Sequence, residues 1–258
     1  MKIGQITFFR VSPRFVVIRA PGQVACSESN CPKSELADSS LFFVQTNPML
    51  PTLLINAGGV SRRMGRPKAL LPAPGSGVPL LRHIAARLLP LARELVVIAN
   101  DPAIPAVIEP LGGSWLADAF PGSGPLGGLA TGLAARDGWH ICVACDLPFV
   151  EPAVFRYLLA QADDDWDAVI PLVEGQAQPL HALYHRRCLS AVENALDMGE
   201  RRMDSFLAQV RTRFVTEDAL RPLDPALHSF FNVNTPEEWA AAEQIAALSQ
   251  GTSPYRAP

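Results

Sequence analysis

Two basic side chains follow a loop of small residues. Gly58 and Gly59 come just after the apolar run at residues 53–55, and Arg63 and Lys68 follow them. Glycines leave the backbone bare, so a ligand can approach the amide groups closely. Arg binds phosphate through paired hydrogen bonds, and Lys supplies a mobile charge. The pattern therefore predicts a site for a phosphate-bearing ligand; an ordinary turn with two solvated bases is the plainer interpretation.

Two familiar phosphate-binding motifs do not fit this loop. It lacks the GxGxxG spacing of a dinucleotide-binding turn, and Lys68 is followed by Ala69 instead of the Ser or Thr of a P-loop. What the loop offers is adjacent glycines, a further glycine at Gly65, and two cations. We expect backbone amides, Arg63 and Lys68 to meet the phosphate together.

A carboxylate follows one of the most apolar stretches of the chain. Residues 141–145 are nearly all apolar, which is typical of a strand buried on both faces, and Asp146 comes next. Open α/β sheets bind ligands at the carboxyl ends of their strands. Asp146 is therefore a candidate site residue, and its plainer role is to cap a helix before Pro148.

Short apolar runs alternate with stretches of helical periodicity from residue 52 onward. This alternation indicates βα units and an α/β fold with a mainly parallel sheet. Thr235 and Glu238 predict a capping box where a last helix begins at Pro236. Strands are expected at residues 52–55, 95–99, 114–117, 141–145, 168–172, 180–184 and 230–233, and further helices at 78–91, 127–135, 152–161, 187–196 and 203–210.

The two ends of the chain differ in pattern from the middle. Residues 1–48 are expected to be an N-terminal appendage, with a small hairpin at 7–9 and 15–18 and a polar, mobile stretch at 26–40. The main domain is then expected at 49–249. Residues 250–258 are expected to be a disordered tail.

Composition and charge exclude several classes of protein. A hydrophobic content of 48% in 258 residues is ample for a core. The net charge of −3 gives no general attraction to nucleic acid or to an anionic membrane. No apolar run reaches the roughly 18 residues that a membrane span needs, and no secretory signal is recognisable, so we expect a cytoplasmic protein.

The five cysteines are expected to be reduced. Cys142 and Cys145 have CxxC spacing, yet they lie in an apolar strand run, where residues three apart point to opposite faces. We therefore expect core thiols and no metal or redox site there.

Further motifs follow the glycine-rich loop in a recognisable order. The residues from Ala57 to Lys68 resemble the opening motif of α/β nucleotidyltransferases, closest to the molybdenum cofactor guanylyltransferases. The resemblance spans about residues 52–247, and it also rests on the GPLGG, CDLP, GERR and NVNTPEE segments, which begin at residues 124, 145, 199 and 232.

The resemblance implies a three-layer, Rossmann-like fold, with the nucleotidyltransferase domain at 49–249, and a magnesium-dependent reaction. GMP passes from GTP to the phosphate of molybdopterin, giving molybdopterin guanine dinucleotide and pyrophosphate. Arg63, Lys68 and Asp146 are implied as catalytic residues, and Asp146 and Asn234 as ligands of Mg²⁺. The implied nucleotide contacts are Asn56, Ala57, Gly58, Gly59, Lys68, Asp118, Gly124, Pro125 and Leu126, and the implied acceptor contacts are Gln178, His181, Arg201, Arg202, Asn232 and Asn234.

Some implied roles leave alternatives open. The carboxylate of Asp118 accepts either from guanine or from the ribose hydroxyls. Arg201 and Arg202 also fit a solvated helix end, and a lone histidine such as His181 is more often structural. The implied partners are GTP and molybdopterin, with transient contact to cofactor-inserting proteins or apo-molybdoenzymes, and with neither nucleic acid nor membrane.

Two departures from the family pattern leave base selectivity open. Asn56 stands where relatives usually carry leucine, and Arg66 where some carry glycine. A CTP-dependent molybdopterin cytidylyltransferase is the nearest alternative, although Gly58 and the GPLGG segment favour guanine. A sugar-phosphate nucleotidyltransferase is disfavoured because the chain lacks a long C-terminal repeat region. A non-catalytic nucleotide-binding module would not need Asp146, Arg63 and Lys68 together.

Overall fold

The computed structural model describes residues 7–12, 15–19, 42–45, 50–58 and 67–251. The chain divides into two compact units, Met1–Leu50 and Pro51–Pro258. In its described residues the first unit forms an antiparallel sheet of β1 (Thr7–Ser12), β2 (Phe15–Arg19) and β3 (Phe42–Gln45), and the β1–β2 pair confirms the predicted hairpin. The predicted mobile stretch at 26–40 and residues 252–258 of the predicted tail lie outside the described residues.

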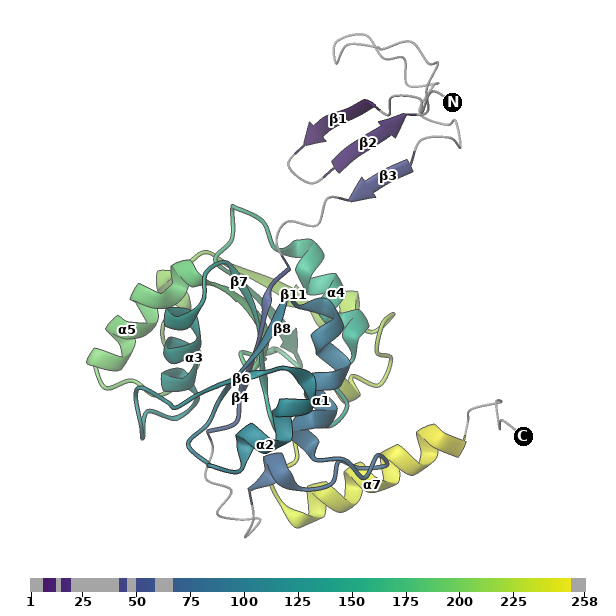
Figure 1. Cartoon of the computed structure of the whole chain (residues 1–258), viewed down its shortest axis with the longest axis vertical. Helices are drawn as coiled ribbons and strands as arrows, with labels where there is room; N and C mark the ends of the chain where they lie inside the picture. The colour runs from purple at the N-terminus through teal and green to yellow at the C-terminus, as the bar shows by residue number, and fades with distance from the viewer. Residues whose placement is uncertain (1–6, 13–14, 20–41, 46–49, 59–66, 252–258) are drawn as a thin grey trace. The chain divides into compact units, whose positions relative to one another are not determined.

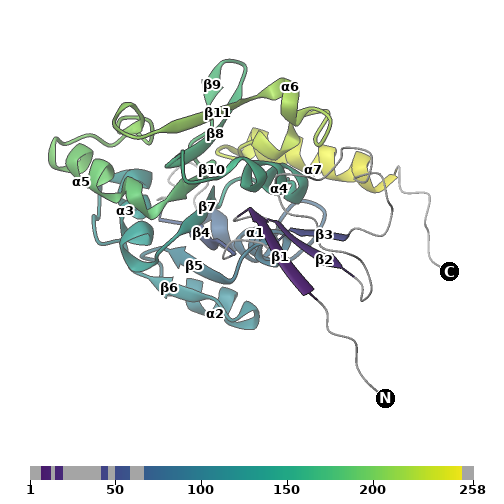
Figure 2. The ribbon, with the colours of Figure 1, turned by 90° about the horizontal axis from the view of Figure 1, so that it is seen from above.

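The second unit is built on one sheet, in the order β11-β8-β10-β7-β4-β5-β6, with β9 beside β8 (Figure 2). Neighbours β7, β4, β5 and β6 are parallel, as are β8 and β11, whereas β10 is antiparallel to β7 and β8. The mainly parallel sheet is thus confirmed. The strands are β4 (Thr52–Asn56), β5 (Glu94–Ile98), β6 (Ser114–Leu116), β7 (Trp139–Ala144), β8 (Ala168–Val173), β9 (Gln176–Ala177), β10 (His181–His185) and β11 (Thr212–Thr216).

Helices cover both faces of this sheet, which confirms the three-layer α/β class (Figure 1). One face packs on α3 (Gly124–Ala135) and α5 (Leu189–Asp197). The other packs on α1 (Leu80–Leu88), α2 (Ile104–Ile108), α4 (Pro152–Gln161), α6 (Glu217–Leu220) and α7 (Pro236–Gly251). Short 3-10 helices span Lys68–Leu70, Leu89–Leu91, Glu109–Leu111, Arg186–Cys188, Leu207–Gln209 and His228–Phe230. None of the helices in the described part of the chain has the length and apolar character needed to cross a bilayer.

The strand that leads to the glycine-rich loop shows why the layers pack closely. Leu53 and Ile55 point to the α1 face and Leu54 to the α3 face, because successive strand residues alternate. A Cβ atom added to Gly132 of α3 would lie 2.3 Å from Cδ2 of Leu54. Glycine at that position lets α3 approach β4, whose carboxyl end carries the loop.

The predicted helix at 203–210 is wrong. Those residues, all described, form turns and the 3-10 helix Leu207–Gln209, and the edge strand β11, which was not predicted, follows. Met203 and Phe206 have helical spacing and are buried. However, Arg202 pairs with Asp204, and the Ser205 hydroxyl donates to the Arg202 carbonyl, so side chains stabilise a turn in place of a helix.

The predicted strand at 230–233 is also wrong. The described residues there leave the 3-10 helix His228–Phe230 and continue without ladder pairing. The segment lies beyond the sheet edge, where the Val233 amide donates to the Asp146 carbonyl at 2.9 Å. Val233 is buried because it docks against the loop after β7, and not because it belongs to a strand.

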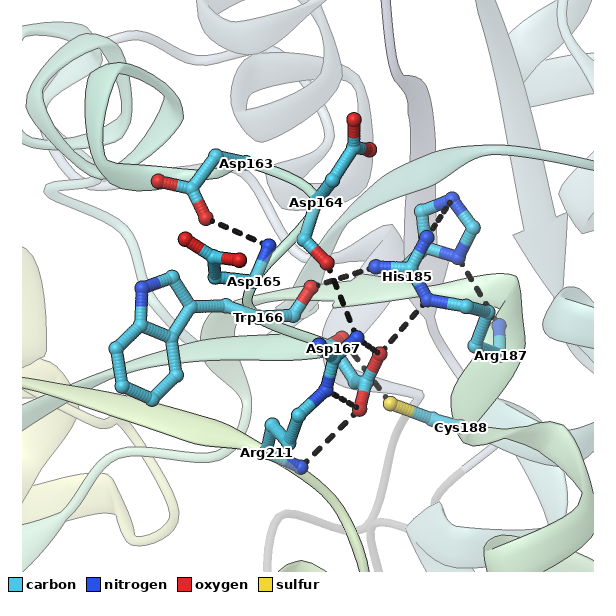
Figure 3. Close-up of polar contacts among 9 residues, drawn as sticks. All are labelled: Asp163, Asp164, Asp165, Trp166, Asp167, His185, Arg187, Cys188 and Arg211. Carbon is cyan, nitrogen blue, oxygen red and sulfur yellow. Dashed lines mark hydrogen bonds and ion pairs between the residues drawn. The ribbon is translucent and has the colours of Figure 1, made fainter.

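A polar cluster lies at the amino-terminal edge of the sheet, where Asp167 precedes β8 (Figure 3). The Asp167 carboxylate accepts from Nε of Arg187 at 2.7 Å and from the side chain and backbone of Arg211 at 3.0–3.1 Å. These hydrogen bonds, those of Arg211 first, hold the pKa of the Asp167 carboxyl well below its usual range. The cluster joins β8, β11 and the start of α5.

We expect Asp167→Asn to lower the free energy of unfolding by about 2–4 kcal/mol, because an amide cannot neutralise the two guanidinium groups that contact it. Urea unfolding at pH 7 measures this. Since the carboxyl pKa is depressed by folding, its contribution is present above the unfolded pKa of 3.8 and is lost as the pH falls below it. The matched control is Asp137→Asn, whose side chain is 88% exposed. Equal losses in the two variants would contradict the assignment.

Candidate active site

Three side chains from distant parts of the sequence meet at the carboxyl edge of the sheet. Nζ of Lys68 lies 3.1 Å from Oδ2 of Asp146 and 2.9 Å from Oδ1 of Asn234. Asp146 follows β7, Lys68 begins a 3-10 helix, and Asn234 precedes α7. The Lys68 and Asp146 side chains are 13% and 21% exposed. A cation and two oxygen ligands are thus close together, in contact with solvent.

The loop that carries Asp146 is held on two sides. The amide of Cys145 donates to the Asn56 carbonyl at the end of β4, and the Asp146 carbonyl accepts from Val233. On α1, His83 contacts the Pro148 carbonyl at 3.1 Å and Nε of Arg87 donates to the Val150 carbonyl. His83 and Arg87 were not identified from the sequence, because a single polar residue on a helix carries no signal of its partner.

The capping box predicted at the last helix is confirmed. Oγ1 of Thr235 accepts from the Glu238 amide at 3.2 Å, and the Glu238 carboxylate accepts from the Thr235 amide at 3.0 Å. The same carboxylate oxygen also accepts from the Asn234 amide. The start of α7 therefore sets the backbone position of Asn234.

Asn56 joins the end of β4 to the start of α3. Its Nδ2 donates to the Pro125 carbonyl at 2.8 Å, and its Oδ1 accepts from the Gly58 amide at 3.3 Å. A Cβ atom on Gly128 would lie 2.4 Å from Nδ2 of Asn56, so only glycine leaves room for this link. The structure places the predicted nucleotide residue Asn56 in contact with the two loops that carry Ala57, Gly58, Gly124 and Pro125.

We expect Gly128→Ala to lower the free energy of unfolding by about 1–3 kcal/mol, because the added methyl group displaces Asn56 from the Pro125 carbonyl. Alanine is otherwise better than glycine in a helix by about 1 kcal/mol. In an Asn56→Ala background the obstruction is absent, so Gly128→Ala should cost at least about 1 kcal/mol less there. Urea unfolding of the two single variants and the double variant measures the coupling. Additive costs would contradict it.

The predicted nucleotide loops take defined positions. Gly124 begins α3 with φ of +66°, so the helix starts three residues earlier than predicted. Leu126, also a predicted nucleotide contact, is fully buried. Oδ1 of Asp118 accepts from the Phe120 amide at 2.9 Å and from the Thr131 hydroxyl at 3.3 Å, so Asp118 orders the loop after β6. The predicted residues Gly59 and Arg63 lie outside the described part of the chain.

The predicted acceptor residues come from separate parts of the chain. The loop with Arg201 and Arg202 lies beside α3, since a Cβ on Gly124 would be 3.9 Å from the Arg201 carbonyl oxygen. Arg202, 79% exposed, forms a bidentate pair with Asp204 at 2.7 and 2.9 Å, which lowers the pKa of the Asp204 carboxyl. Asn232 is exposed and Gln178 is half-buried.

His181, predicted as an acceptor contact, lies in the core in this structure. Its ring is stacked on Phe155 at 4.2 Å and lies 4.5 Å from the ring of Phe230, and the residue is 2% exposed. Burial lowers its pKa to about 3. As the first residue of a strand covered on both faces, it packs under α4.

The two cysteines of the CxxC motif point to opposite faces of the sheet, as predicted. Cys142 packs with the α3 and α5 side, and Cys145 with the α1 side. Burial raises the pKa of both thiols to about 12. In the described residues the thiols are free, so they act as core side chains.

The oxygens of Asp146 and Asn234 fit a hard divalent cation. Mg²⁺ takes one or two protein oxygens and completes its shell with water and phosphate. Both oxygens here already converge on one cationic nitrogen. The described part of the chain holds no cluster of three His, Cys, Asp or Glu residues suited to a metal.

The chain is similar in sequence to known proteins. The family model of the MobA-like NTP transferase domain matches residues 53–214. The chain is 33% identical over 195 residues to a probable molybdenum cofactor guanylyltransferase of Bacillus cereus, covering 74% of this chain and 94% of the relative. A protein of the same name from Pelotomaculum thermopropionicum is 34% identical over 204 residues, covering 77% and 95%.

A solved structure extends the likeness to the fold. Molybdopterin-guanine dinucleotide biosynthesis protein A from Archaeoglobus fulgidus superposes with a TM-score of 0.67 at 27% identity, covering 76% of this chain and 99% of that one. The matched residues 53–214 contain Lys68, Asp146 and all of β4 except Thr52. The chain therefore belongs to the family of MobA-like NTP transferases, and it is a nucleotidyltransferase.

Proposed function

We propose that the protein transfers GMP from GTP to the phosphate of molybdopterin, forming molybdopterin guanine dinucleotide and pyrophosphate. The observation that carries the proposal is the convergence of Lys68, Asp146 and Asn234 at the carboxyl edge of the sheet. The names of the relatives support guanine as the base and molybdopterin as the acceptor.

The reaction is an in-line exchange at the α-phosphorus of GTP. An oxygen of the molybdopterin phosphate forms a bond to that phosphorus, and the bond to the bridging oxygen of the β-phosphate breaks, so pyrophosphate leaves with the electron pair. The acceptor phosphate is already ionised at neutral pH and needs no general base. Catalysis then consists of positioning two anions and balancing the charge that develops between them.

The residues of this chain divide that task. Lys68 neutralises charge on the triphosphate and the departing pyrophosphate, and Arg63 is expected to assist it. Asp146 and Asn234 would hold Mg²⁺, which supplies further charge neutralisation at the phosphates. The link from Asn56 to Pro125 keeps Gly58, at the start of the glycine-rich loop, beside the start of α3, where we place the nucleotide.

The acceptor is placed on the side of the loop that carries Arg201. That loop lies next to Gly124, so a ligand there is adjacent to the proposed nucleotide site. The Arg202 guanidinium, already paired with Asp204, is the less available of the two cations. We expect the product to pass to cofactor-inserting proteins or apo-molybdoenzymes.

The decisive experiment incubates the purified protein with Mg²⁺, labelled GTP and molybdopterin, and separates the products. We expect labelled dinucleotide and pyrophosphate in equal amounts. Parallel reactions with CTP test the nearest rival, and a clear preference for CTP would replace guanylyl by cytidylyl transfer. Nucleotide binding without either product would favour a non-catalytic carrier.

A further inference from the structure

The Glu238 carboxylate does more than cap a helix. In a capping box the residue at this position accepts from the amide of the capping residue, here Thr235. Oε2 of Glu238 makes that bond at 3.0 Å and also accepts, at 2.5 Å, from the amide of Asn234, which lies outside the helix. The second bond fixes a residue of the candidate site and is not needed to begin α7.

The backbone of Asn234 is therefore held by hydrogen bonds on both sides. On one side the Val233 amide donates to the Asp146 carbonyl at 2.9 Å. On the other the Glu238 carboxylate holds the amides of Asn234 and Thr235. With its backbone held, Asn234 directs Oδ1 at Nζ of Lys68. A chain of contacts thus runs from Glu238 through Asn234 to Lys68, and from Lys68 to Asp146.

We propose that Glu238 is a positioning residue of this site. It fixes the backbone of Asn234, so that the amide oxygen stays on Lys68 and beside Asp146. Its effect on the oxygen pair follows from geometry alone, whereas its effect on turnover rests on the proposed function. Residues that orient a metal ligand commonly change metal affinity or activity by about 10–100-fold when they are replaced.

The competing explanation is that Glu238 only stabilises the start of α7. Substitutions at two neighbouring residues, Glu237 and Thr235, distinguish the two explanations. Glu237 lies in the same first turn and also places a negative charge near the helix N-terminus. Thr235→Ala removes the bond from the Glu238 amide and leaves the Asn234 amide unchanged. If capping alone mattered, Thr235→Ala would act like Glu238→Ala. If positioning matters, Glu238→Ala stands apart.

The lysines provide a readout that needs neither substrate nor metal. The sequence contains three of them, Lys2, Lys33 and Lys68, so lysine labelled with ¹⁵N at Nζ gives few NMR signals, and Lys68→Arg identifies the one of interest. We expect Glu238→Ala to shift the Lys68 signal and to speed exchange of its ammonium protons, as Asn234→Ala does. Glu237→Ala and Thr235→Ala should leave the signal in place. An unmoved Lys68 signal in Glu238→Ala would overturn the proposal.

A second measurement tests the oxygen pair as a metal site. Titration with Mn²⁺ in the absence of nucleotide should show affinity about tenfold weaker in Glu238→Ala than in Glu237→Ala. Glu238→Gln keeps an acceptor oxygen and should restore most of the affinity and of the Lys68 signal, which also guards against a poorly folded alanine variant. Equal Mn²⁺ affinity in the Glu237 and Glu238 variants would refute the positioning role. If the protein failed to transfer GMP, the proposed function would fall, while the lysine signal would still decide this inference.

Discussion

Replacing Asp146 with Asn is expected to reduce the turnover number by at least about a hundredfold, because one well-placed charged group contributes about 10²–10³ in rate. Asn keeps the shape of Asp but loses the charge that faces Lys68 and would hold the metal. Both side chains keep contact with water, so we expect the free energy of unfolding to change by only about 1 kcal/mol. Pyrophosphate release under saturating GTP and Mg²⁺ measures the effect.

The control lies at the other end of the same strand. Asp137 precedes β7 and pairs with Arg186 at the surface, so Asp137→Asn removes an equal charge without touching the site. That variant should retain the activity of the wild type. GTP binding by Asp146→Asn should persist because Lys68 remains. Unchanged pyrophosphate release in Asp146→Asn would remove Asp146 from the mechanism.

Mild acid is expected to destabilise the fold strongly, because two histidines are buried in the neutral form. Burial lowers the pKa of His140 to about 4 and that of His181 to about 3. Between those values and the ordinary 6.5, the unfolded chain binds protons that the folded chain does not, so stability falls as the pH falls. Each histidine contributes at most about 1.4 kcal/mol per pH unit, and less near pH 6.5, where the unfolded side chain is half-protonated, so the two together cost roughly 3 kcal/mol between pH 6.5 and 5. Urea unfolding across this range measures the loss.

A single substitution separates the two contributions. His181→Leu removes one titrating group from between Phe155 and Phe230, so the pH dependence below 6.5 should become shallower by at most about 1.4 kcal/mol per unit. This holds whatever the substitution does to stability at pH 7. Burial also lowers the pKa values of His83 and His185, which add contributions of the same sign. A free energy of unfolding that stays constant from pH 6.5 to 5 would contradict the prediction.

The buried strands were predictable because their residues are apolar over their whole length. β4, β5 and β7 were found close to their true limits, and α4 was predicted with its exact bounds. β11 was missed because it is a short edge strand with two apolar residues, Phe214 and Val215, between polar ones, and Phe214 is half-exposed. Sequence periodicity reveals a strand only through the burial of its side chains. β11 is instead stabilised by the pairing of its backbone with β8, which leaves no such pattern.

The site was predictable in part. The glycine-rich loop indicated Lys68, the rule that ligands bind at the carboxyl ends of strands located Asp146, and the family resemblance supplied Asn234. Periodicity could not show that His181 faces two aromatic rings. A strand covered on both faces has no solvent-exposed side, so its sequence pattern does not indicate which of its residues a ligand can reach. The second role of Glu238 was not predictable either. The sequence indicated the capping box, but not the hydrogen bond that Glu238 accepts from the Asn234 amide.

The wide separation of the site residues along the chain has a consequence for biosynthesis. Lys68 is 78 positions from Asp146 and 166 from Asn234, whereas the last described strand of the central sheet ends at Thr216. Domains emerge from the ribosome amino end first. A growing polypeptide can thus complete the described sheet before the third group of the site exists, so the site assembles only after Asn234 has been synthesised.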